Sequence, residues 1–138
     1  MTEARFRQLN FIRNLPAHVI DEPPALLGDD TAPNPSEALL AALGSCIAVG
    51  IHANAVAQGI ALSSLELELE GDLNITSVWG TGHTTGPKPV GFTAVRVRVK
   101  LDAAADREIL AKLVAHAVEW SPVAGTVRNP VPVDVRLA

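Results

Sequence analysis

The sequence has little sulfur and little positive charge. Its single cysteine, Cys46, allows no internal disulfide, which is usual for a reducing compartment. The first eleven residues, MTEARFRQLNF, are alternating and charged, so they lack the apolar run of a signal peptide. We therefore expect a cytoplasmic protein. A chain of 138 residues, 48% hydrophobic and 19% charged, predicts a single globular domain over residues 1–138.

A basic surface stripe is also missing. The net charge is −4, and the lysines and arginines are scattered along the chain instead of gathered as a phosphate backbone requires. Nucleic acid is therefore not an expected partner. Repeats and low-complexity segments do not occur.

Several site motifs are absent. The four histidines share no metal-ligand spacing with one another or with Cys46; they are His18, His52, His83 and His116. The segment GTGHTTG, residues 80–86, lacks the Lys-Ser/Thr ending of a phosphate loop. The strained GxSxG turn of a Ser-His-Asp hydrolase is missing, because GSC at 44–46 falls inside a predicted helix. We expect neither a metal nor a cofactor.

The longest apolar run predicts a central helix over residues 35–58. Asn34 is a suitable N-cap, Pro35 a suitable first helical residue, and Gly59 a suitable stop, while Glu37 favours the positive end of the helix dipole. Residues 38–51 are apolar on every side apart from Ser45, so the helix should be buried in protein. The run is shorter than the roughly 20 residues of a membrane span, so no membrane association is expected.

The other segments predict an α+β chain. Two strands, 5–12 and 18–21, should form an opening hairpin, and an ordered loop then leads to the central helix. Strands at 61–69 and 91–101 should pair, since the first presents glutamates and the second arginines and lysine on one face. Between them we expect a turn or bulge at Gly71 and Asp72 and a long loop over 75–90. A helix over about 104–120, beginning at Asp102 and ending before Pro122, precedes a final edge strand.

The residues alone leave two interpretations of Cys46 open. On so apolar a helix it can be a small packed hydrophobe, or it can be a reactive thiol if a nearby cation favours the thiolate. Candidates for that cation are Arg5, Arg7 and Arg13.

Separate motifs, in order along the chain, resemble those of the OsmC/Ohr family of thiol-dependent hydroperoxide-reducing proteins. The motifs are APNPSEALLAALGSC, the helix exit over 55–60, EGDL at 70–73, GFTAVRVRVKL, and SPV with PVPVDV. The segment DEPPALLGDD, residues 21–30, is similar to an OsmC-like branch of that family.

This resemblance implies an OsmC-like fold, in which two long helices pack with a curved antiparallel sheet, and an intertwined homodimer with its sites at the subunit interface. It implies that Cys46 is a peroxidatic cysteine, which attacks an organic hydroperoxide in oxidative-stress defence. An external thiol would then act as reductant. The alternative is a non-catalytic protein that binds a small apolar ligand at the same interface, with Cys46 merely packed.

The chain departs from the family pattern at two positions. Ser121 stands where the family has its resolving cysteine, so the usual disulfide cannot form. Ser36 replaces the glutamate that holds the activating arginine, and Glu37, one place later, lies about 100° around the helix. The family's arginine matches Arg13. The predicted catalytic residues are thus Cys46, Arg13, Glu37 and Ser121.

Overall fold

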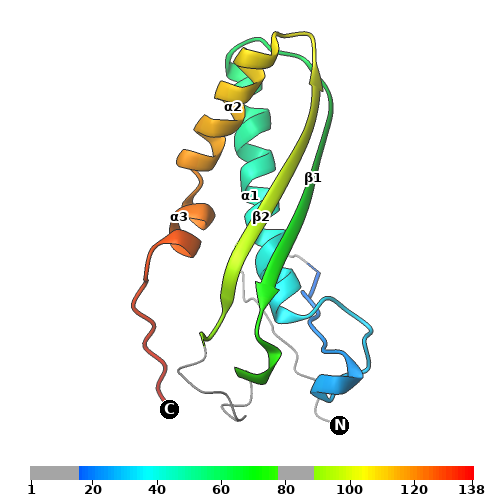
Figure 1. Ribbon diagram of the computed structural model, residues 1–138, viewed down its shortest axis with the longest axis vertical. Coiled ribbons are helices and arrows are strands. Elements are labelled where there is room, and N and C mark those ends of the chain that lie inside the picture. Colours follow the sequence, from blue (N-terminus) through cyan, green and yellow to red (C-terminus); the bar gives the residue numbers. More distant parts are fainter. Residues whose placement is uncertain (1–15, 78–88) are drawn as a thin grey trace. The chain divides into compact units, whose positions relative to one another are not determined.

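The computed structural model describes residues 16–77 and 89–138, which contain three α-helices and one pair of strands (Figure 1). In chain order the elements are η1 (Pro24–Leu26), α1 (Pro35–Ala57), β1 (Leu62–Leu73), η2 (Ile75–Ser77), β2 (Phe92–Ala103), α2 (Arg107–Glu119) and α3 (Pro122–Arg128). Two compact units, Met1–Ala41 and Ala42–Ala138, divide the chain within α1.

In the first unit, the carboxylate of Asp21 organises the loop before α1. It accepts hydrogen bonds from the backbone N–H groups of Glu22, Asp29 and Thr31 and from the Thr31 hydroxyl, at 2.7 to 3.4 Å. Gly28 closes the loop, because a Cβ there would stand 1.7 Å from the Glu22 carbonyl oxygen. These bonds, the one from the Thr31 N–H foremost, lower the pKa of Asp21 from 3.8 to about 2.

The loop should therefore loosen in acid. Because the pKa of Asp21 is lower in the folded chain, its bonds stabilise the loop above the unfolded value of 3.8 and are lost as the pH falls toward about 2. Hydrogen exchange should show the amide of Thr31 losing protection over that interval. Asp21→Asn is the control, since its weaker protection should not depend on pH there; unchanged protection of the native amide at pH 2 would contradict the assignment.

The start of α1 is the predicted one. Asn34 Oδ1 accepts from the Glu37 N–H and Glu37 Oε2 accepts from the Asn34 N–H, both at 2.9 Å, which is a capping box. The helix ends at Ala57, and Gly59 follows with φ +69°, in the left-handed region that suits glycine.

The strands β1 and β2 form the predicted antiparallel pair, drawn as a long curved hairpin in Figure 1. The register places Glu66 opposite Lys100, Glu68 opposite Arg98 and Glu70 opposite Arg96; these pairs are also ion pairs on an exposed face. Hydrogen bonds from Lys100 and Arg98 lower the pKa of the Glu68 carboxyl. Exposed ion pairs contribute little stability, so the main effect of these three pairs is to favour this register of the strands.

Both strands run further than predicted. β1 continues to Leu73, with a register irregularity between Asp72 and Leu73, so the expected break at Gly71 is a bulge rather than a turn. The ring of Phe92 covers Gly71, where a Cβ would lie 2.3 Å from a ring carbon. Glycine at position 71 thus leaves room for the Phe92 ring to pack against the end of β1.

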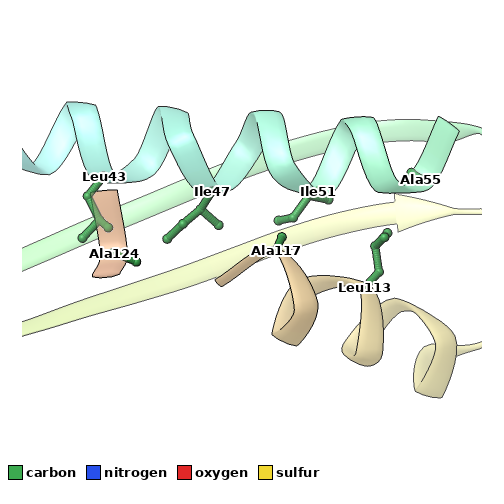
Figure 2. Close-up of a cluster of buried hydrophobic side chains, with 7 residues drawn as sticks. All are labelled: Leu43, Ile47, Ile51, Ala55, Leu113, Ala117 and Ala124. Atoms are coloured by element: carbon green, nitrogen blue, oxygen red, sulfur yellow. The ribbon is translucent and has the colours of Figure 1, made fainter. Parts of the chain in front are cut away.

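The core of the second unit lies between α1 and the two later helices (Figure 2). Its buried residues are Leu43, Ile47, Ile51 and Ala55 from α1, Leu113 and Ala117 from α2, and Ala124 from α3. The apolar faces of β1 and β2 pack against this cluster. The helices approach closely where Gly50 meets Ala117, since a Cβ on Gly50 would lie 3.3 Å from that of Ala117.

Some predicted boundaries are wrong. Asp102 belongs to β2, where it pairs with Ser64, and α2 begins at Arg107 after Asp106 in the N-cap position. The predicted helix end before Pro122 is confirmed, because α2 ends at Glu119. The helix α3, which begins at Pro122, was not predicted, although proline fits a first helical position.

Two predicted strands are absent from the described residues. Residues 18–21 are irregular, and the tail over 129–138 is exposed and has no strand beside it in the described part of the chain. A strand requires a hydrogen-bonding neighbour, and Pro130 and Pro132 also lack the donors for one. The predicted strand over residues 5–12 and the segment 78–88 lie outside the described residues.

In the described part of the chain α1 is buried on one side, so its burial all round stays a prediction that depends on a second subunit. Val49 is 67% exposed and Val56 64% exposed. Among the described residues α1 is also the one helix long and apolar enough to meet the criteria for a membrane span, which a protein's core helix meets as well. In the described part of the chain, Val49 and Val56 on its outer face are therefore largely uncovered.

Candidate functional site

Cys46 lies in the middle of α1, at the border between its covered and uncovered faces. The residue after it, Ile47, is in the core, while Val49, three residues after Cys46, is largely exposed. Cys46 itself is half-buried and is a free thiol.

Ser121 contacts that sulfur from the junction of α2 and α3. Its hydroxyl donates to Cys46 Sγ at 3.1 Å, although the two residues are 75 positions apart in the sequence. The same oxygen accepts a hydrogen bond of 3.1 Å from the Ala124 N–H, which makes Ser121 the N-cap of α3. Ser121 is only 5% exposed. The Ser121 hydroxyl thus uses its one proton toward the sulfur and one of its two lone pairs toward the Ala124 N–H.

This arrangement places a hydrogen-bond donor against a thiol sulfur. A hydrogen bond donated to sulfur stabilises the thiolate more than the thiol, and the buried serine is held in place by a helix cap. Every buried side-chain nitrogen or oxygen among the described residues has a hydrogen-bond partner, and Ser121 Oγ is one of these atoms.

Of the four predicted site residues, the described part of the chain brings Cys46 and Ser121 together. Glu37 forms the capping box with Asn34, which gives its carboxylate a structural use. Arg13 lies outside the described residues, as do Arg5 and Arg7. In the described ranges, no group of three or more histidines, cysteines and carboxylates is arranged to hold a metal ion.

A residue that the sequence analysis did not select is Arg128, the last residue of α3. Its Nε donates to the Ala124 carbonyl at 3.2 Å and its Nη2 donates to the Val118 carbonyl at 3.1 Å. A basic residue in the last turn of a short helix is an ordinary pattern, so the sequence offered little to distinguish it.

A sequence profile of the family described as OsmC-like protein matches residues 28–136 of this chain. No curated protein sequence matches it.

Several solved structures have a similar fold. The organic hydroperoxide resistance protein OsmC of Legionella pneumophila, described as a predicted redox protein, is 24% identical, with a TM-score of 0.60 over 83% of this chain and 75% of that one. An OsmC-like hydroperoxide resistance protein from Jannaschia sp. CCS1 is 19% identical, with a TM-score of 0.58 over 88% and 73%. An OsmC-like protein from Mycoplasma pneumoniae is 16% identical, with a TM-score of 0.61 over 78% and 68%. At these identities the similarity establishes the fold alone.

Proposed function

The chain belongs to the OsmC family, and from this premise we propose that it is an organic hydroperoxide reductase whose reactive thiol is Cys46. The observation that most supports this is the hydrogen bond from the buried Ser121 hydroxyl to Cys46 Sγ. Two structures of similar fold are described as hydroperoxide resistance proteins, which agrees with the proposal.

In the first half-reaction, the Cys46 thiolate attacks one oxygen of the O–O bond of an organic hydroperoxide. The S–O bond forms as the O–O bond breaks, and the departing alkoxide takes a proton to become an alcohol. Cys46 is oxidised to a sulfenic acid, and the hydroperoxide is reduced by two electrons. The Ser121 hydroxyl favours the starting thiolate.

The second half-reaction needs a thiol from outside the chain. The sequence has no second cysteine, and Ser121 cannot form a disulfide. One external thiol would condense with the sulfenic acid to a mixed disulfide and release water. A second would attack that disulfide, which regenerates Cys46 and yields the oxidised reductant. A reducing, cytoplasmic compartment would supply both.

We also propose that the working form is a homodimer. Beside Cys46, the uncovered face of α1 carries an exposed stripe of Ala42, Val49, Ala53 and Val56. Such a stripe, at spacings of seven, four and three residues, suits packing against a second helix. A second copy would cover it and would place an apolar wall beside the thiol.

The decisive experiment measures oxidation of Cys46 itself. Stoichiometric organic hydroperoxide should convert the native protein to a sulfenic acid, trapped by a dimedone probe, much faster than it oxidises a free thiol. Cys46→Ser should remove both the adduct and any thiol-dependent peroxide consumption. Arg13→Ala should slow oxidation about tenfold or more if Arg13 is the activating cation.

Matched variants identify which arginine acts. Arg5→Ala and Arg7→Ala should leave the rate near native if Arg13 alone lies at the thiol. If Cys46 reacts only as fast as a free thiol, and no arginine matters, the reductase proposal fails. Retained binding of a small apolar ligand by that protein would favour the non-catalytic alternative.

A further inference from the structure

The corner between α2 and α3 is tied together by one guanidinium group. Arg128 donates to two backbone carbonyls, those of Val118 in the last turn of α2 and Ala124 in α3. These carbonyls lie three residues before and three residues after Ser121. The guanidinium therefore spans the residue that contacts Cys46.

The two carbonyls belong to the two residues that hold Ser121. The Ser121 N–H donates to the Val118 carbonyl at 3.4 Å, and the Ser121 Oγ accepts from the Ala124 N–H at 3.1 Å. Arg128 thus shares the Val118 carbonyl oxygen with the Ser121 N–H. It also binds the carbonyl of Ala124, the residue whose N–H donates to Ser121 Oγ. A planar guanidinium with several fixed donors suits such a bridge better than a single ammonium group.

We propose that Arg128 is a positioning residue that holds the Ser121 hydroxyl against Cys46 Sγ. It acts through Ser121 and does not itself touch the sulfur. Without Arg128, the junction of α2 and α3 should loosen, and the Ser121 hydroxyl should be hydrogen-bonded to the thiolate for a smaller fraction of the time. This role rests on the proposed function, because a reactive thiol is the reason to hold the hydroxyl there. Its effect on the thiol can nevertheless be measured without a hydroperoxide.

The test is a double-mutant cycle, read by the rate at which iodoacetamide, a neutral reagent, alkylates Cys46. Arg128→Met should slow alkylation about two- to tenfold, the usual effect of one hydrogen bond, and Ser121→Ala should slow it by a similar factor. The double variant should be no slower than Ser121→Ala alone. Arg128→Lys should restore the rate only in part. Arg136→Met is the control, since Arg136 pairs with Asp134 in the exposed tail.

Two results would overturn the proposal. If Arg128→Met lowers the melting temperature but leaves the alkylation rate native, Arg128 is only structural. If it slows alkylation as much in the Ser121→Ala background as in the native one, it acts on the thiol by another route. Should Arg128→Met not fold, Arg128→Lys takes its place in the same cycle. A protein that fails to react with hydroperoxide, yet shows the expected cycle, would refute the proposed reductase activity and leave the positioning role intact.

Discussion

Ser121→Cys is expected to form a disulfide with Cys46 within one chain when it is treated with one equivalent of organic hydroperoxide. The native hydroxyl oxygen lies 3.1 Å from Cys46 Sγ, so a sulfur in its place has about 1 Å to move to reach the ~2.05 Å bond length of a disulfide. The sulfenic acid on Cys46 would be captured by its new neighbour faster than by any external thiol. Dithiol-dependent turnover should then exceed that of the native protein.

The same disulfide should be visible in stability. It would close a loop of 75 residues, which in the chain-entropy account adds about 4 kcal/mol to the free energy of unfolding. Peptide mass spectrometry under non-reducing conditions would identify the cross-link. Thr126→Cys, which adds a thiol on an exposed position of α3, is the control and should remain uncrosslinked. Two separately over-oxidised cysteines in Ser121→Cys would contradict the expected geometry.

The second large effect concerns association. Val49→Glu should convert a homodimer into a monomer. In one chain Val49 is 67% exposed, so the new carboxylate would not disturb the core, but in a packed helix pair it would be buried without a partner. An uncompensated buried charge costs about 3–5 kcal/mol, which corresponds to a hundredfold or greater loss of affinity. Sedimentation of both proteins at micromolar concentration would show the difference.

A matched substitution separates this from general destabilisation. Ala111→Glu adds the same group to an exposed position on α2 and should leave the assembly unchanged. A dimer should also unfold at a temperature that rises with protein concentration. A native protein that sediments as a stable folded monomer would remove the interface from the proposed site.

The sequence predicted those elements that depend on a short motif or on two matching charge patterns. The start of α1 follows from Asn34, Pro35 and Glu37, which are adjacent in the chain. The pairing of β1 with β2 follows from two opposite charge patterns of the same period. The α+β, OsmC-like fold inferred from separate motifs is confirmed.

What could not be predicted depends on neighbours distant in sequence. The sequence predicted that a helix ends before Pro122, but not that a second helix begins there and buries Ala124 against the core. The alternating tail over 129–138 has the composition of a strand, yet a strand exists only beside another. The role proposed for Arg128 depends on its two carbonyl partners, which lie four and ten residues away in the sequence.

The spacing of the core residues along α1 explains why the helical segment that packs on it is divided into α2 and α3. Leu43, Ile47, Ile51 and Ala55 are four residues apart, so each step passes a full turn by about 40°, and the buried line winds about 120° around the helix. Two short helices follow that winding line, with Ala124 beside Leu43 and Leu113 toward the Ala55 end (Figure 2). Their junction falls opposite Cys46, so the thiol meets a helix start, where a serine is favoured, instead of a helix interior, where it is not.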